Sequence, residues 1–265
     1  MSGFIRFCSI SSSSVYGNCY FVESPGGMRI LIDCGVTLRR LERYLAEMGV
    51  APESISAIFV THDHGDHTAA LEIRNPFAAR YRIPVYATRG FWQRWVNRDR
   101  IDSDLKRTIT PGSGVDLGDC RVKAFLKPHD SIEPVGYTVC CDGRALSIVT
   151  DLGCVPPEVA DAVRDSTHLI FESNHDRAME LSSGRAARLI YRVLSDVGHL
   201  SNDQAARALS EVVTHETRVI LLSHLSLDCN RPQLALRAAN SALARRFDVD
   251  VEVAPADRPS RMFLA

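Results

Sequence analysis

Short apolar runs recur along the 265-residue chain, and segments with helical spacing separate the later ones. Short runs rich in Val, Ile, Leu and Phe and bounded by turn residues are typical of strands. The predicted strands are residues 4–10, 19–23, 29–33, 55–61, 121–126, 135–140, 145–150, 169–172, 218–222 and 249–253.

Helical spacing is clearest in residues 37–48, where Leu38, Leu41 and Leu45 recur at intervals of three and four and Gly49 follows. The other predicted helices are residues 66–81, 157–164, 185–196, 202–213 and 231–246. Strands that arrive first as hairpins and then alternate with helices predict an α/β (α+β) fold, with helices covering the outer faces of the sheets. No linker-like stretch or repeat divides the sequence, so we predict one domain over residues 1–265.

The composition of the chain excludes several classes of protein. With 45% hydrophobic and 24% charged residues, the chain is too apolar to be disordered, and its longest apolar runs are too short to cross a membrane. The first residues lack the features of a signal peptide, so a cytoplasmic location without a membrane partner is expected. A net charge of -1 excludes a globally basic nucleic-acid binder but not a local basic patch.

Eight cysteines form no C-x-x-C pair and no zinc-finger spacing, and we expect them to be reduced and mostly buried. Metal chemistry would therefore depend on histidine and aspartate.

The segment from Thr61 to His67 is the strongest chemical signal. It follows an apolar predicted strand and reads Thr-His-Asp-His-Gly-Asp-His, which is H-x-H-x-D-H. Imidazole and carboxylate together suit zinc, iron or manganese. His62 and His64 project to one side of an extended segment and can hold one ion, while Asp66 and His67 can reach a second.

Two ions need further ligands, and three residues elsewhere have the same context. His129, Asp151 and His224 each come just after a predicted strand, where loops on a rigid scaffold commonly build sites. We therefore predict that the three side chains join the H-x-H-x-D-H segment.

These motifs resemble those of the metallo-β-lactamase-fold hydrolases over almost the whole chain, and most closely the YycJ/WalJ branch. The features of that branch are Gly17-Asn18-Cys19-Tyr20, Pro128-His129-Asp130 before Glu133-Pro134-Val135-Gly136, Glu172-Ser173-Asn174-His175-Asp176, Gly198-His199-Leu200-Ser201-Asn202 and Ser223-His224-Leu225-Ser226. The resemblance implies a four-layer αββα sandwich, with two mixed sheets flanked by helices and a dinuclear centre at the sheet edge.

Carried over by position, the resemblance implies two divalent ions, with zinc favoured and manganese or iron as alternatives. One ion would be held by His62, His64 and His129, and the other by Asp66, His67 and His224, with Asp151 bridging both. Asp33 and Asp63 would orient the metal-binding loop as outer-sphere residues.

Two such cations can share a water, lower its pKa and clamp an in-line displacement. The bridging hydroxide would be the nucleophile, and Asp66 would accept a hydrogen bond from it. His199 is the candidate acid for the leaving group, and it precedes a helix whose start is predicted to be capped by Ser201 with Gln204. That helix start could also hold a phosphate. Asn174, His175 and Asn202 are assigned to outer-sphere support or substrate contact.

The segment of residues 74–107 has two interpretations. It holds nine basic residues and three acidic ones, together with Trp92 and Trp95. Basic residues with aromatic neighbours suit single-stranded nucleic acid. The alternative is an amphipathic helix with Phe91, Trp92 and Trp95 in the core and Arg94 and Arg98 in solvent, and we favour it.

Three functions remain open. A metal-dependent phosphodiesterase, favoured as an exonuclease on DNA ends, follows from the family branch. A hydrolase of a small cyclic phosphodiester, thioester or lactone is the alternative, because one bimetallic core serves several substrates. A non-catalytic metal-binding regulatory protein is disfavoured by the complete set of seven ligands. No obligate protein partner is indicated.

Overall fold

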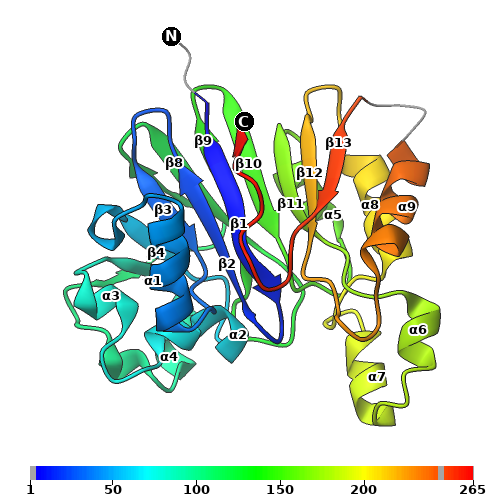
Figure 1. Ribbon diagram of the computed structural model, residues 1–265, viewed down its shortest axis with the longest axis horizontal. Helices are drawn as coiled ribbons and strands as arrows, with labels where there is room; N and C mark the ends of the chain where they lie inside the picture. The colour runs from blue at the N-terminus through cyan, green and yellow to red at the C-terminus, as the bar shows by residue number, and fades with distance from the viewer. Residues whose placement is uncertain (1–3, 244–247, 265) are drawn as a thin grey trace.

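Two β-sheets packed face to face form the centre of the protein (Figure 1). The structure is a computed structural model that describes residues 4–243 and 248–264. The strands of the first sheet lie in the order β14-β1-β2-β3-β4-β5-β6. Their bounds are β1 Arg6–Ser13, β2 Gly17–Glu23, β3 Arg29–Ile32, β4 Ala57–Phe59, β5 Val85–Ala87, β6 Lys106–Thr108 and β14 Phe263–Leu264.

The second sheet has the order β13-β12-β11-β10-β9-β8-β7. Its strands are β7 Gly114–Leu117, β8 Cys120–Leu126, β9 Val135–Cys141, β10 Arg144–Val149, β11 His168–Glu172, β12 Val219–Ser223 and β13 Asp250–Val253. In each sheet, four neighbouring strands are parallel: β3 to β6 in the first and β10 to β13 in the second. Parallel strands are covered on both faces, which explains why β11 and β12 are buried along their whole length.

Helices cover the outer face of each sheet (Figure 1). The helices on the side of the first sheet are α1 Leu38–Glu47, α2 Gly65–Thr68, α3 Phe77–Arg80 and α4 Arg89–Arg94. Those that follow in the chain are α5 Pro157–Val163, α6 Arg177–Leu181, α7 Ala187–Val193, α8 Asn202–Val212 and α9 Pro232–Leu243. Short 3-10 turns span Pro52–Ser54, Ala69–Leu71 and Arg98–Arg100.

Three apolar layers hold the sandwich together. The middle layer joins the two sheets around Phe59, whose ring stacks on Tyr86 and meets Tyr137 edge-on. The outer layers join each sheet to its helices. The predicted four-layer αββα arrangement is confirmed. The interpretation of residues 1–265 as one domain stays a prediction.

The predicted helix over residues 66–81 is wrong. The structure has the short helices α2 and α3 there, separated by an irregular segment. Asn75 precedes Pro76, and proline disfavours the helical conformation of the residue before it. Several short elements were also not predicted, namely β5, β6, β7, β14 and α6, because two to five residues carry too little periodicity.

The expectation that all cysteines are reduced is also wrong. Cys120 and Cys141 lie opposite each other on β8 and β9 and form a disulfide. Cys8, Cys19 and Cys34 are free and buried, as expected.

The aromatic residues of segment 74–107 are in the core, which confirms the favoured interpretation. Phe91 and Trp95 are buried and stacked on each other, and Trp92 packs against the same cluster. Arg94 and Arg98 are exposed. Among the described residues, no helix is both long and apolar enough to span a membrane.

Candidate metal centre

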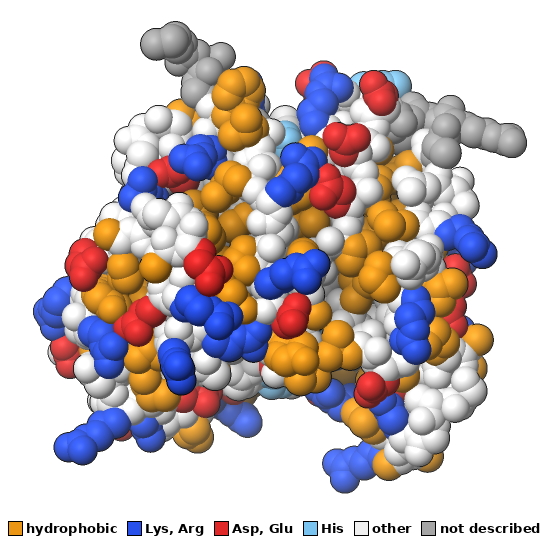
Figure 2. Space-filling model, in the orientation of Figure 1, with side chains coloured by type: hydrophobic (Ala, Val, Ile, Leu, Met, Phe, Trp, Pro, Cys, Tyr) orange, Lys and Arg blue, Asp and Glu red, His pale blue; other side chains and the backbone are white. Residues whose placement is uncertain are grey.

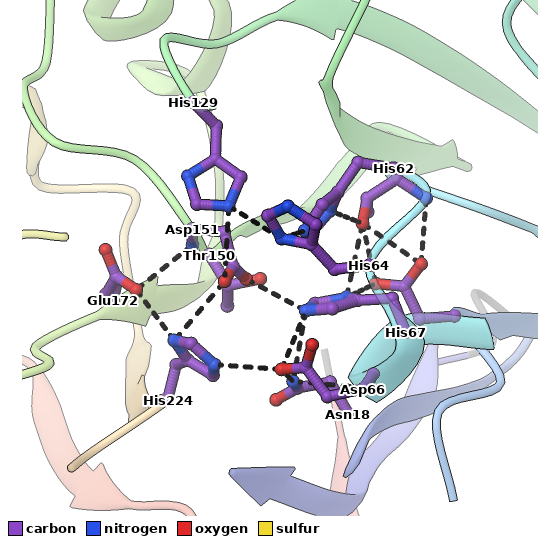
Figure 3. A network of polar contacts seen from close by, with 12 residues as sticks. Asn18, His62, His64, Asp66, His67, His129, Thr150, Asp151, Glu172 and His224 are labelled. Carbon is purple, nitrogen blue, oxygen red and sulfur yellow. Dashed lines mark hydrogen bonds and ion pairs between the residues drawn. The ribbon is translucent and has the colours of Figure 1, made fainter. Parts of the chain in front are cut away.

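The predicted ligands lie at one edge of the sandwich, where the carboxyl ends of several strands meet (Figure 3). The H-x-H-x-D-H segment follows β4 and continues into α2. His129 follows β8, Asp151 follows β10 and His224 follows β12. Ligand sites of open α/β sheets form at this edge, because neighbouring parallel strands end there together.

The backbone turns sharply after β3, β10 and β12. Asp33, Asp151 and His224 adopt left-handed conformations, with φ angles of 62°, 58° and 57°. Such angles are uncommon for residues other than glycine and cost free energy, so they persist only where the surroundings hold them. Each of these three side chains has close polar neighbours in the site, which supplies that support.

Three imidazoles form the first ligand group. His62 Nε2 lies 3.1 Å from His64 Nδ1, and His129 Nε2 lies 3.3 Å from the same atom. Tetrahedral zinc with Zn–N bonds of 2.0–2.1 Å separates its ligand atoms by about 3.3 Å. The spacing of the three nitrogens therefore fits one zinc-like ion.

Asp66, His67 and His224 form the second group. Asp66 Oδ2 lies 3.6 Å from His67 Nε2 and 3.7 Å from His224 Nε2. Asp151 stands between the two groups, because its Oδ2 is 3.2 Å from His67 Nε2 and its Oδ1 is 3.9 Å from His129 Nε2.

Two atoms at the centre of the second group are buried and lack hydrogen-bond partners among the described residues: His224 Nε2 and Asp151 Oδ2. Buried polar atoms without partners are costly, and a bound cation would satisfy both. The donor set thus fits a second divalent ion.

Asp33 holds two of the imidazoles from behind. Its Oδ2 accepts a hydrogen bond from His67 Nδ1 at 2.7 Å, and its Oδ1 accepts one from the Thr61 amide at 2.8 Å. The Thr61 hydroxyl lies 2.9 Å from both Asp33 and His62 Nδ1. These contacts place the Nε2 atoms of His62 and His67 toward the centre of the site. Asp33 thus contacts His67 directly and His62 through Thr61.

Glu172 does the same on the other side of the site, and we did not predict it as a site residue. Its carboxylate is buried and accepts hydrogen bonds from His224 Nδ1 at 2.9 Å and His199 Nδ1 at 3.0 Å. It also accepts backbone N–H groups from Asp151, Leu152 and Leu200. The sequence carries a signal for Glu172, because this acidic residue ends an apolar strand and Asp33 directly follows one.

Asn18 and Lys127 also contact the site without having been predicted. The Asn18 amide nitrogen lies 3.2 Å from Asp66 Oδ2 and 3.1 Å from His67 Nε2. The buried Lys127 ammonium donates to the backbone carbonyls of Thr150 and Asp151 at 2.6 and 2.7 Å. Lys127 thereby connects the His129 loop to the Asp151 loop.

Among the other predicted residues, His199 and Asn174 lie next to the ligands. The ring centroid of His199 is 5.1 Å from that of His224 and 5.4 Å from that of His129, and its side chain is 12% exposed. Asn174 Nδ2 donates to the His224 carbonyl at 2.7 Å and so supports the ligand's backbone.

The remaining four predicted residues lie further out. Asp63 accepts a hydrogen bond from the Ser131 hydroxyl, which links the metal-binding loop to the loop after His129. His175 is fully buried, and neither ring nitrogen has a hydrogen-bond partner among the described residues. Ser201 forms the predicted capping box with Gln204, and Asn202 bonds to Ser173 and Asn230.

The two ligand groups differ in their affinity for protons. Burial lowers the pKa of His62, and burial together with the Lys127 ammonium lowers the pKa of His129 to about 3. In the second group burial also opposes protonation, but Asp151 and neighbouring carboxylates outweigh it. They raise the pKa of His224 to about 10 and that of His67 well above its usual value.

Metal uptake should therefore release protons unequally. At pH 7, His67 and His224 carry protons that an ion must displace, whereas His62 and His129 are already neutral. We expect about two protons released by the second group and almost none by the first, so that affinity for the second ion rises with pH up to about 10. Calorimetric titration in buffers of different ionisation enthalpy measures this release. Equal release from both groups would contradict the assignment.

Comparison with known proteins identifies the family of the chain. The model of the beta-lactamase superfamily domain matches residues 28–225. The chain belongs to this family. Exodeoxyribonuclease YycJ of Bacillus anthracis is 34% identical over 240 residues, which cover 90% of this chain and 89% of that protein. Exodeoxyribonuclease WalJ of Streptococcus pneumoniae serotype 2 (strain D39 / NCTC 7466) is 32% identical over 240 residues, covering 89% and 88%.

Two solved structures share the fold over nearly the whole chain. The metallo-beta-lactamase fold protein YhfI from Bacillus subtilis superposes with a TM-score of 0.75 at 16% identity, covering 99% of this chain and 100% of that one. Zn(2+)-bound PqqB from Methylobacterium extorquens gives a TM-score of 0.71 at 15% identity, with coverage of 97% and 99%. At these identities the likeness concerns the fold alone.

Proposed function

We propose that this superfamily member is a metal-dependent exodeoxyribonuclease that removes nucleotides from the ends of DNA. The observation that carries the proposal is the pair of ligand groups that face each other across Asp151, with Asp151 oxygens 3.2 Å from His67 Nε2 and 3.9 Å from His129 Nε2. A phosphodiester is the substrate that gains most from two adjacent cations. The two exodeoxyribonuclease relatives, similar over about nine tenths of both chains, support the same substrate.

In this proposal seven side chains hold two divalent ions. The first ion is bound by His62, His64 and His129, and the second by Asp66, His67 and His224, with Asp151 reaching both. Imidazole with carboxylate suits zinc best, with manganese and iron as alternatives. When bound, the ions would supply a nucleophilic water and neutralise charge on the phosphate oxygens.

The protein's own groups then orient the reactants and move protons. Asp66 is only partly buried and lies at the open side of the second group, where its carboxylate can accept a hydrogen bond from the attacking water. His199 donates Nδ1–H to Glu172, which leaves Nε2 as the atom that can pass a proton to the departing oxygen. Glu172 is thus a positioning residue for the proposed acid.

The start of α8 is a poor phosphate site. The backbone N–H of Ser201 bonds to Gln204 Oε1, that of Asn202 bonds to the His175 carbonyl, and that of Gln204 bonds to Ser201 Oγ. An anion at a helix start needs free N–H groups. The substrate phosphate is therefore assigned to the ligand groups and not to this helix.

The test is an assay of the purified protein, loaded with zinc or manganese, on four substrates in parallel. These are end-labelled linear DNA, the same sequence as a covalently closed circle, a cyclic nucleotide and a thioester. We expect progressive shortening of linear DNA and no cutting of the circle. Turnover of the thioester alone, or cutting of the closed circle, would contradict the proposal.

The His199→Ala variant separates the proposed acid from the ligands. Because general acid catalysis contributes roughly 10²- to 10⁴-fold, DNA turnover should fall by that factor while both ions stay bound. An activated diester with a nitrophenolate leaving group needs no acid and should lose much less activity. Metal content is measured by elemental analysis. Loss of an ion from this variant would instead make His199 a ligand.

A further inference from the structure

Residues 176–198, which connect β11 to α8, form an arm that extends beyond the sheet edge and contains α6 and α7 (Figure 1). We call it the α6–α7 arm. Four of its large apolar side chains are exposed to solvent: Leu181 56%, Leu189 39%, Tyr191 80% and Val197 44%. Within α7, Val193 is the buried residue. Apolar surface gathered on one projecting element marks an interaction site.

The arm is attached directly to the metal centre. Arg192 Nη2 on α7 donates to Asp130 Oδ1 at 2.9 Å. The same Asp130 oxygen lies 3.5 Å from His129 Nε2 and 3.8 Å from His64 Nε2. At the base of the arm, the His199 amide donates to the Val193 carbonyl at 3.0 Å. A Cβ on Gly198 would lie 2.1 Å from the Arg192 carbonyl oxygen, so glycine permits this close packing.

Helical spacing brings three α7 side chains together. Arg188 lies three residues before Tyr191 and four before Arg192, and side chains at these spacings are neighbours on a helix surface. Arg188 is exposed and has no ion pair or hydrogen bond among the described residues. Arg192 contacts the loop of the metal centre, and Arg188 and Tyr191 are its neighbours on the exposed surface of α7. Figure 2 shows a notch at the lower edge of the molecule, with histidine at its upper end and basic side chains on both sides.

We propose that the α6–α7 arm is the platform for a single-stranded DNA end that enters or leaves the metal centre. Tyr191 stacks on a base, and Arg188 contacts the phosphate backbone. This inference rests on the proposed function and adds the form of its substrate: an unpaired strand, because the base faces of a duplex are covered. An aromatic face beside a free guanidinium matches the alternation of bases and phosphates in such a strand.

A second copy of the chain suits this face less well. A symmetric contact would bring the same α7 surfaces together and place the unpaired guanidinium of Arg188 near the like charge of the other copy. DNA complements that charge, and the arm is continuous with the site where the phosphodiester would react. The charge and the position of the arm together therefore favour a nucleic-acid strand.

The test measures binding of a fluorescein-labelled 12-nucleotide single strand to the full-length protein by anisotropy. We expect Tyr191→Ala to weaken binding about 10-fold, as loss of one base stack does, and Tyr191→Phe to restore it. Arg188→Ala should lower the slope of log affinity against log salt by about 0.7. Phe4→Ala, an exposed aromatic (52%) before the start of β1, is the matched control and should bind as the wild type does.

Two further measurements separate this inference from the proposed function. Hydrolysis of bis(p-nitrophenyl) phosphate, which has no DNA strand to lie along the arm, should be unchanged in Tyr191→Ala. If the wild type degrades DNA and Tyr191→Ala binds and degrades it equally well, the platform is wrong while the nuclease proposal stands. If the wild type neither binds nor degrades DNA with any metal, the proposed function itself fails. A wild-type dimer that Tyr191→Ala converts to a monomer in sedimentation would assign the face to a second copy and overturn the platform.

Discussion

Replacing Asp151 by asparagine should lower DNA turnover by about a thousandfold or more. Asp151 is buried, and its two oxygens point toward different ligand groups (Figure 3). The neutral amide keeps the shape of the side chain but removes the charge that both ions would share. Charge stabilisation by such ions contributes several kcal/mol to a phosphoryl-transfer transition state, and about 4 kcal/mol corresponds to a thousandfold in rate.

The same substitution should also lower metal content. We expect the second ion to be lost or weakened first, because the nearby His224 and His67 lower the pKa of Asp151 well below its usual value despite burial, so that its negative charge is held beside that group. Turnover is measured on end-labelled DNA and metal content by elemental analysis of the same sample. The exposed Asp161, altered to asparagine, is the control and should retain both. If Asp151→Asn turned over DNA as fast as the wild type, Asp151 would not bridge the two ions.

Glu172→Gln should weaken binding of the second ion and lower turnover by about 10- to 100-fold each, the usual effect of altering a partner that orients a metal ligand. The Glu172 carboxylate accepts from both His224 and His199, and these two imidazoles hold the pKa of Glu172 below its usual value despite burial. A glutamine side chain has only one acceptor oxygen, and its NH₂ group would face an imidazole N–H. One of the two imidazoles would therefore lose the hydrogen bond that orients it.

Glu23→Gln is the matched control for Glu172. Glu23 is also a buried glutamate at the end of a strand, but β2 runs antiparallel to β3, so Glu23 lies beside the start of β3, away from the metal centre, and pairs with Arg6 and Arg29. The control should lose some stability and keep wild-type metal affinity, measured by competition with a chromophoric chelator. Equal metal affinities of Glu172→Gln and the wild type would show that Glu172 does not position the ligand.

The part of the site that the sequence predicts is the part with a local pattern. Thr61 to His67 contains four of the seven proposed ligands within six residues, so their proximity follows from chain connectivity. His129, Asp151 and His224 were found by a weaker rule, that polar residues after buried strands share an edge. That rule works here because β8, β10 and β12 run in the same direction.

The residues that were missed act through contacts with no local signature. Glu172 meets residues 20 to 52 positions away in the chain, and Asn18 meets the metal-binding loop from 48 or 49 positions away. The disulfide between Cys120 and Cys141 likewise depends on the register of β8 against β9. Register and packing are properties of the assembled sheets, which spacing along one sequence does not contain.

The central claim is that seven side chains hold two divalent ions, and anomalous diffraction from crystals of metal-loaded protein tests it most directly. Two peaks are expected in the anomalous map. One lies about 2.1 Å from His62 Nε2, His64 Nδ1 and His129 Nε2, and the other lies among Asp66, His67 and His224, with Asp151 in contact with both. A single peak, or two peaks away from these side chains, would contradict the account.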